Sequence, residues 1–257
     1  MKSLKIQYAL IRREIKMILS YKGLLVTSIL SPLAYFLLFS YNFSTNFSQI
    51  EYGGHVISYL NFLFIGIIAM QSFNQFGMSI IKTSNDKRFG MVRMLFSTNI
   101  TTADYFFAKV IGSIIIVTLQ ILLLFIGGII IANTITFTIP QILILLSAVI
   151  LGTTFWNLSG SIIGLYSKAE DVRDMITGLL SLPLLFASSV FYNVDNLPSV
   201  LKIIAKNNPL SFIADIIRDF FVLSIIRIDL LAILLLMIAL QICFIIFFAD
   251  SFLKRLQ

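Results

Sequence analysis

Cysteine, histidine and charged residues are all scarce in this sequence of 257 residues. It contains one cysteine, Cys243, and one histidine, His55. The chain therefore offers no thiol pair for a disulfide or redox centre and almost no ligands for a transition metal. Charged residues make up only 12% of the chain. Catalysis of the kind found in soluble hydrolases, which needs a nucleophile and a base, has few residues to draw on.

Apolar residues are abundant instead, at 58%, and the mean hydropathy is +0.97. Values this high exclude an ordinary soluble domain and indicate a polytopic membrane protein. We predict an all-α fold that forms one transmembrane domain over residues 1–257, with six membrane-spanning helices. The expected spans are 23–41, 59–81, 105–132, 141–166, 175–192 and 230–249.

The first 22 residues have the pattern of an amphipathic helix. Six basic residues lie among apolar residues that recur at helical spacing, as in Leu4, Tyr8, Ile11 and Ile15. This pattern is typical of a helix that lies at the membrane interface. A cleaved signal peptide fits less well, because the basic region is long and no small-residue cleavage site follows the apolar run.

The distribution of basic residues predicts how the chain is oriented. Of 19 lysines and arginines, 15 lie in the N-terminal segment, in residues 82–109 and 168–174 and in the C-terminal tail, and the other four lie between the fifth and sixth spans. By the positive-inside rule, both termini of this multi-pass protein are expected on the cytoplasmic side of the cytoplasmic membrane. The net charge of +7 does not indicate nucleic-acid binding, because the charges lie between apolar runs rather than on one solvated face.

Residues 197–218 are interrupted too often to cross a bilayer. Pro198 and Pro209 each remove a backbone donor, and each is well placed to open a short helix. We expect two amphipathic helices that dip into the outer face of the membrane as a re-entrant hairpin. The residues expected to act there as an extracellular gate are Pro198, Lys202, Lys206, Asn208, Pro209, Asp215 and Arg218.

Polar side chains inside the predicted spans are the other candidates for function, because lipid offers them no hydrogen bonds. They lie on the second span and at the fifth: Gln71, Asn74, Gln75, Ser181, Ser188 and Ser189. Such residues either hold helices together or line a translocation path, and the residues alone leave both interpretations open. On the fourth span, Asn157, Gly160 and Gly164 are predicted to allow close helix packing.

Three stretches in the same order carry a family resemblance. They are residues 59–70 (YLNFLFIGIIAM), residues 88–95 (RFGMVRML), and the pairs Leu197-Pro198 and Asn208-Pro209 followed by residues 215–218. Together they resemble the membrane subunit of ABC type-2 exporters, most closely the short drug- and lipid-export permeases of bacteria and archaea. The resemblance implies a dimer of permeases, either two copies of this chain or one copy and a related chain, surrounded by membrane lipid.

The resemblance also implies a separate ATPase subunit bound to each permease. Residues 85–96 would be the coupling helix that meets it, through Lys87, Arg88, Phe89, Gly90, Arg93 and Leu95. Arg93 occupies a position that is usually acidic in the family, which implies an ATPase surface of matching charge. The chain has no G-x-x-x-x-G-K-[ST] sequence, so we expect it to bind no cofactor and the ATPase subunit to hold ATP and Mg²⁺.

We therefore expect a transport subunit, not an enzyme, that exports an amphiphilic drug, lipid or lipid-linked molecule. In the family, the second and fifth helices flank the route, which favours the path for Gln71, Asn74 and Gln75. Export of a polysaccharide or glycolipid by the same architecture is one alternative. An ATP-independent secondary transporter fits less well, because the predicted spans contain essentially no ionisable residues in their cores. An enzyme acting on lipids would need a catalytic set that the sequence does not show.

Overall fold

The computed structural model describes residues 2–20, 23, 26, 30, 32–38, 49–98, 100–132, 137–167 and 169–249. Nine of the 19 residues of the first predicted span, residues 23–41, lie outside this set, as does the C-terminal tail. Within the described residues, four helices are long and apolar enough to cross a membrane: Tyr59–Arg88, Thr102–Gly128, Ile139–Tyr166 and Ile228–Phe248. The chain is a helical membrane protein with these four candidate spans.

The described elements are almost all helical, apart from one small antiparallel hairpin in which Gln49 pairs with Ser58. In chain order they are α1 (Lys2–Ser20), β1 (Gln49–Tyr52), β2 (His55–Ser58), α3 (Tyr59–Arg88), α4 (Met91–Phe96), α5 (Thr102–Ala132), α6 (Ile139–Tyr166), α7 (Glu170–Phe186), a 3-10 turn (Val194–Asn196), α8 (Ser199–Lys206), α9 (Pro209–Leu223), α10 (Ile228–Phe244) and a π-helical turn (Ile245–Ala249).

Helix α3 forms the centre of the bundle and packs most extensively against α6. The close approach depends on small residues, because a Cβ atom at Gly160 of α6 would overlap the carbonyl oxygen of Phe76 on α3. Asn157 of α6 joins three helices, since its Nδ2 donates to Ser79 Oγ of α3 at 2.8 Å and to Ser113 Oγ of α5 at 2.6 Å. The residues predicted to allow close packing thus do so here.

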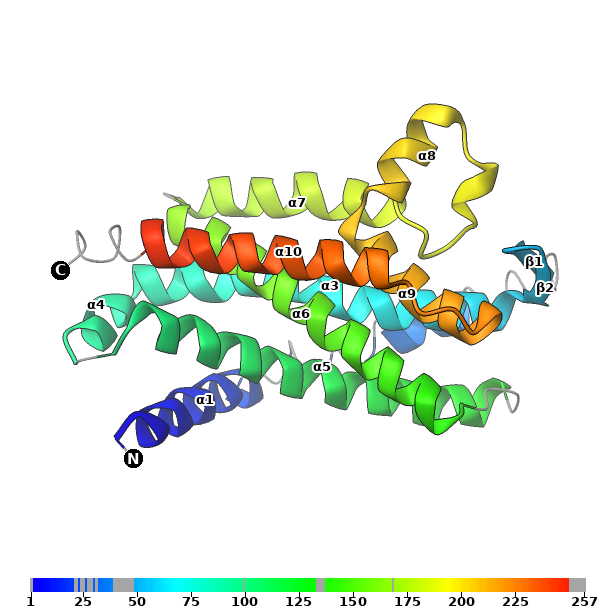
Figure 1. The fold of residues 1–257 in the computed structure, drawn as a ribbon. Helices are drawn as coiled ribbons and strands as arrows, with labels where there is room; N and C mark the ends of the chain where they lie inside the picture. The colour runs from blue at the N-terminus through cyan, green and yellow to red at the C-terminus, as the bar shows by residue number, and fades with distance from the viewer. Residues whose placement is uncertain are drawn as a thin grey trace.

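The long helices run roughly side by side, and the remaining elements gather at the two ends of the bundle (Figure 1). Helix α4, the first residues of α1 and the end of α10 lie at one end. The β1–β2 hairpin lies at the other end, near α9, and α8 projects outward from the bundle there. The short elements therefore form two separate groups, one at each end of the bundle.

Several observed boundaries differ from those expected from hydropathy. Helix α3 continues to Arg88 rather than ending near residue 81, because its polar last turns bury Asp86 among basic partners from other helices. Helix α7 covers Glu170–Phe186 rather than 175–192, with Pro183 inside it. Residues 49–58, expected in a loop, form the hairpin around Gly53 and Gly54.

Candidate functional site

The end of α3 and helix α4 form an exposed, basic and apolar surface. Gly90 has a φ of 69°, a left-handed conformation that suits glycine and separates the two helices. Phe89 and Met94 are exposed, at 73% and 57%, whereas Leu95 is buried. Residues 85–88 belong to α3, so only Met91–Phe96 form the separate short helix within the segment 85–96.

Lys87 and Arg88 are held against neighbouring helices. Lys87 Nζ donates to the carbonyl oxygens of Leu165 and Ser167, at 3.0 Å each, where α6 ends. Arg88 forms an ion pair with Glu170 in the first turn of α7. The end of α3 is thereby tied to both α6 and α7. Of the residues in this surface, Phe89, Met94 and Arg93 are left exposed on α4 and the turn before it.

Asp86 is the centre of a buried ion cluster that links α1, α3 and α5. Its carboxylate accepts a hydrogen bond from Tyr105 Oη at 2.8 Å and lies 2.9 Å from Lys109 Nζ, and it pairs with Arg13 of α1. Asp86, Tyr105 and Lys109 are nearly inaccessible to solvent. The sequence analysis did not single out Asp86, although an acidic residue among so many basic ones was a usable signal.

The polar residues expected on the path fall into two groups. Asn74 and Gln75 of α3 line a cavity, and Asn74 Nδ2 donates to Oε1 of the buried Gln71 at 3.3 Å. Ser188 and Ser189 lie beyond the end of α7. There, Ser188 Oγ donates to the carbonyl oxygen of Leu185, and Ser189 Oγ donates to Asp215 of α9 at 2.8 Å. Ser181 lies half-buried on α7 itself.

Arg218 is the centre of the cluster at the hairpin end of the bundle. Its side chain is fully buried and donates to the carbonyl oxygens of Val190 at 2.8 Å, Phe62 at 2.9 Å and Ser189. Two of these carbonyls belong to the irregular segment after α7. Asp215 lies 3.9 Å from the guanidinium. Arg218 therefore fastens α9 to both α3 and this segment.

Asn208 fixes the junction between α8 and α9. Its side-chain oxygen caps α9 by accepting from the N–H of Leu210 at 2.9 Å. Its Nδ2 donates to the carbonyl oxygens of Leu184 and Ala187, at 2.6 and 2.7 Å, where α7 ends. Pro209 opens α9, and Pro198 occupies the residue before α8.

Lys202 and Lys206 of α8 share one partner, Asp195. The two Nζ atoms lie 3.0 and 3.1 Å from Asp195 Oδ1. The hydrogen bonds from Lys202 and Lys206 hold the pKa of this carboxyl below its usual value. The sequence analysis predicted neither Asp195 nor the contact between Tyr52 Oη of β1 and Asp219 of α9, at 2.8 Å. Both contacts join segments whose distance in space could not be inferred from the sequence.

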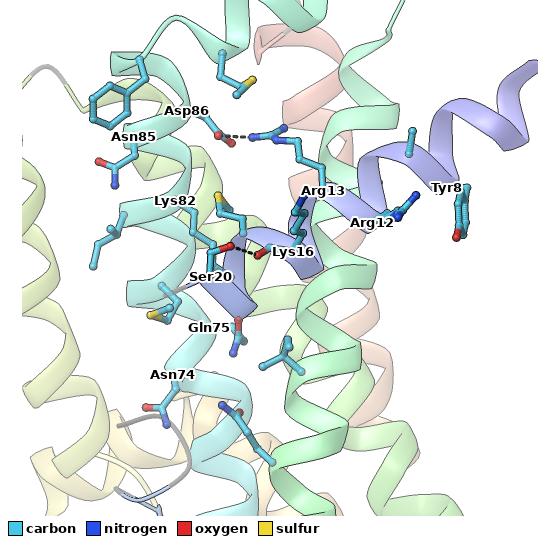
Figure 2. A pocket seen from close by; sticks show the side chains of 18 residues that line it. Tyr8, Arg12, Arg13, Lys16, Ser20, Asn74, Gln75, Lys82, Asn85 and Asp86 are labelled. Carbon is cyan, nitrogen blue, oxygen red and sulfur yellow. Dashed lines mark hydrogen bonds and ion pairs between the residues drawn. The ribbon is translucent and has the colours of Figure 1, made fainter. Parts of the chain in front are cut away.

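A cavity of about 830 Å³ lies between α1, α3 and α5. Figure 2 shows Arg12, Arg13, Lys16 and Ser20 on its α1 side and residues of α3, from Asn74 to Asp86, facing them. Arg13 and Asp86 meet across it. The cavity opens near the same end of the bundle as α4, and Phe89 and Met91 also line it.

A comparison with models of protein families identifies the family of this chain. The family model described as ABC-2 type transporter matches residues 7–222, which include most of α1 and all but the last residue of α9. The chain belongs to the ABC-2 transporter family. The comparison with curated proteins finds no match. The resemblance inferred from residues 59–70, 88–95 and 197–218 is thus confirmed at the level of the family.

As an ABC-2 permease, the chain is a transport subunit without catalytic activity of its own. The matched region is a membrane permease domain and not a nucleotide-binding domain. Among the described residues, no group of three or more His, Cys, Asp or Glu side chains is placed to hold a metal ion. Members of the family generally pair with ABC ATPase subunits. The exposed surface around α4 is the candidate site for such a contact.

Proposed function

We propose that this permease exports an amphiphilic molecule, such as a drug, a lipid or a lipid-linked compound, and is driven by separate ATPase subunits that dock on α4. The observation that carries the proposal is the exposed surface of Phe89, Arg93 and Met94 at the end of the central helix. Bulky apolar side chains next to cations, beyond the end of a membrane span, are typical of a protein interface.

The contacts behind α4 support its role as the coupling helix. Val92 and Leu95 are buried in the bundle, and only Phe89 and Gly90 separate α4 from the end of α3. The end of α3 is in turn bonded to α6 and α7 through Lys87 and Arg88, and to α1 and α5 through Asp86. A displacement of α4 by a closing ATPase would therefore move several helices together as a rigid body.

We place both termini, α4 and the ATPase subunits on the cytoplasmic side. The reason is the concentration of 15 of 19 basic residues at this end in the predicted topology. In this orientation the membrane is the cytoplasmic membrane of a bacterium or archaeon. The β1–β2 hairpin, α8 and α9 then lie at the outer face.

The substrate path is proposed to run from the cavity beside Asn74 and Gln75 towards the cluster around Arg218. Helices α8 and α9 form a re-entrant outer lid over this path. Asn208, Arg218 and the pairing of Lys202 and Lys206 with Asp195 hold the lid closed. Ser188, Ser189 and Asp215 lie beneath it, and Pro198 and Pro209 set where its two helices begin.

A second permease copy, or a related chain, is proposed to pack on α7. None of the residues of α7 is buried within this chain, and Leu179, Leu182 and Phe186 are among its exposed apolar side chains. This assigns two permeases and two ATPase subunits to the complex, with ATP and Mg²⁺ bound by the ATPase.

The experiment is co-expression with the ATPase encoded beside the permease gene. We expect the two to copurify and, in proteoliposomes, to move a fluorescent phospholipid between leaflets only when ATP is supplied. A glycolipid probe moved in place of the phospholipid would indicate glycan export by the same architecture. If no ATPase binds and an ion gradient alone drives movement, the chain is a secondary transporter and the proposal fails.

A further inference from the structure

The walls of the cavity between α1, α3 and α5 are mostly apolar. Met17 of α1, Met78 and Ile81 of α3 and Ile116 of α5 contribute to them. A volume of about 830 Å³ lies within the range of known small-molecule sites. The cavity is thus large enough for a head group together with the first part of an apolar chain.

The charges on the cavity are strongly unbalanced. Among the described residues that line it, four are basic, namely Arg12, Arg13, Lys16 and Lys82, and one is acidic, Asp86. Asp86 is already paired with Arg13 and with Lys109, which lies behind it. By contrast, the side chains of Arg12, Lys16 and Lys82 make no hydrogen bond or ion pair within the part of the chain that the structure describes.

Lys82 is the most informative of these cations because it is partly buried on the central helix. Removing an ammonium group from water is costly unless an anion or several acceptors replace the lost hydration. Figure 2 shows Lys16 of α1 on the side of the cavity towards Lys82 and Arg12 further along α1, beside Tyr8. Both α1 cations are exposed. Cations from two helices therefore border one cavity. The carboxylates that attract Lys82 electrostatically, Glu14 and Asp86, form no ion pair with it among the described residues and are already paired with Arg13.

The charged and the uncharged polar residues of the cavity lie at different depths along α3, with the charge nearer to the membrane surface. Lys82 lies six residues before the end of α3, whereas Gln75 lies seven residues further in. At about 1.5 Å per residue, this places the neutral, polar part of the cavity about 10 Å deeper than Lys82. The cations thus border the shallow part of the cavity, next to the amphipathic helix α1.

We propose that this cavity binds an anionic amphiphile from the inner leaflet. Its phosphate or carboxylate group pairs with Lys82, Arg12 and Lys16. Its apolar chain lies against Met78, Ile81 and Ile116. The inference rests on the proposed function, which sets the orientation, and it deepens that function by assigning a negative charge to the substrate class.

A neutral or cationic amphiphile would fill the same apolar walls but would supply no ion pair to Lys82. An anion adds charge-assisted hydrogen bonds, each equivalent to about a tenfold change in affinity. The cavity should therefore discriminate by head-group charge, and the discrimination should depend on these cations rather than on the overall positive charge of the chain.

The test uses the full permease together with its ATPase in nanodiscs of phosphatidylcholine. Spin-labelled phosphatidylglycerol and phosphatidylcholine are compared by the fraction of motionally restricted label. We expect the anionic lipid to be preferred at least about fivefold. The variant Lys82→Gln and the double variant Arg12→Gln/Lys16→Gln should each remove most of this preference, whereas Lys82→Arg should retain it.

The matched control is Lys5→Gln, which removes an exposed cation of α1 that does not line the cavity. It should leave the preference unchanged, and an equal loss in this control would mean that the lipid responds only to the general charge of the surface, which overturns the proposal. Competition with glycerol phosphate separates an amphiphile from a free anion. If glycerol phosphate displaces the lipid at similar concentrations, the apolar walls contribute nothing and the proposal also fails.

Size-exclusion profiles of each variant, with the ATPase still bound, show that it remains folded. If the wild-type permease, with the ATPase bound, shows no preference for the anionic lipid, the cavity assignment is overturned and the proposed function still stands. A permease that prefers anionic lipid through Lys82 but recruits no ATPase would support the cavity and refute the proposed function. The two failures are therefore distinguishable.

Discussion

Arg218 of α9 lies over the ring of Phe62 of α3, with its guanidinium carbon 3.5 Å from the ring centroid. The same guanidinium donates to the backbone carbonyl of Phe62 and to two carbonyls of the segment after α7. A buried cation is tolerated here because several acceptors and a π face replace its hydration. One side chain thus joins three parts of the chain at the hairpin end of the bundle.

Replacement of Arg218 by methionine should destabilise this end strongly. The carbonyls of Phe62, Ser189 and Val190 would lose their buried donor, at a total cost of about 3 kcal/mol or more. Thermal unfolding followed by fluorescence-detected size exclusion should show a clear fall in the midpoint. The control is Arg227→Gln, because Arg227 is partly exposed and pairs with Asp219 and Asp229. Equal midpoints for the two variants would contradict this account.

Gly160→Ala should separate α6 from α3. The added methyl group would overlap the carbonyl oxygen of Phe76, and backbone on both sides leaves no flexible group to move away. We expect a loss of about 1–3 kcal/mol, as for overpacking in other cores. Gly178→Ala is the matched control on α7, because a Cβ atom there meets nothing within 4 Å. The midpoint of Gly178→Ala should be unchanged or higher.

Asp86→Asn should weaken the junction of α1, α3 and α5. The change removes the counter-charge of Lys109, which is almost fully buried, and leaves Arg13 with Glu14, 3.7 Å away, as its remaining acidic partner. Loss of one partner from a buried pair costs about 3–5 kcal/mol. Adding Lys109→Met should recover part of the lost stability, which a double-mutant cycle measures. Additive effects of the two changes would show that the pair is not coupled.

The pairing of α8 with Asp195 should depend on pH. Lys202 and Lys206 lower the pKa of Asp195 below its ordinary value of about 3.9. The pairing therefore contributes stability above that ordinary value and loses it as the pH falls through the lower value in the fold. The groups are largely exposed, so the contribution is below about 1 kcal/mol.

Limited proteolysis with pepsin measures this pH effect. Asp195→Asn should be cleaved faster than the wild type within residues 194–208 at about pH 4.5, where only the wild type keeps the ion pairs. The difference in cleavage rate should shrink as the pH falls towards about 2, because protonation of Asp195 removes the ion pairs from the wild type as well. A constant ratio between the two pH values would contradict the role assigned to Asp195.

The general fold could be predicted from the sequence because apolar runs and prolines determine structure within their own segment of the chain. Long apolar runs identified all four candidate spans, and Pro198 and Pro209 lie where α8 and α9 begin. Hydropathy predicted helix ends less well. Helix α3, for example, extends through polar residues such as Asp86, whose partners Arg13 and Lys109 come from other helices. The β1–β2 hairpin had a local signal, two glycines between short runs, which the sequence analysis did not use.

The candidate site was predictable in part. The motif around Gly90 identified the segment that contains α4, and the polar face of α3 identified two residues of the cavity, Asn74 and Gln75. The cavity itself was not predictable, because it depends on how α1 packs across α3 and α5. The complete burial of Arg218 was not predictable either. Its partners are carbonyls, which leave no trace in side-chain patterns.

The central claim is that ATP-driven movement enters the permease through α4. The most direct measurement uses the double variant Phe89→Ala/Arg93→Glu, which alters the exposed face of this surface and leaves Val92 and Leu95 in place. Its matched control is Lys5→Glu on α1. Each is purified with the ATPase and assayed in proteoliposomes for ATP-dependent lipid movement.

The account predicts that the double variant binds the ATPase at least about tenfold more weakly, and that it loses ATP-dependent movement while keeping the wild-type unfolding midpoint. Lys5→Glu should behave like the wild type. Unchanged ATPase binding and unchanged ATP-driven movement in the double variant would show that the energy enters elsewhere and would contradict the account.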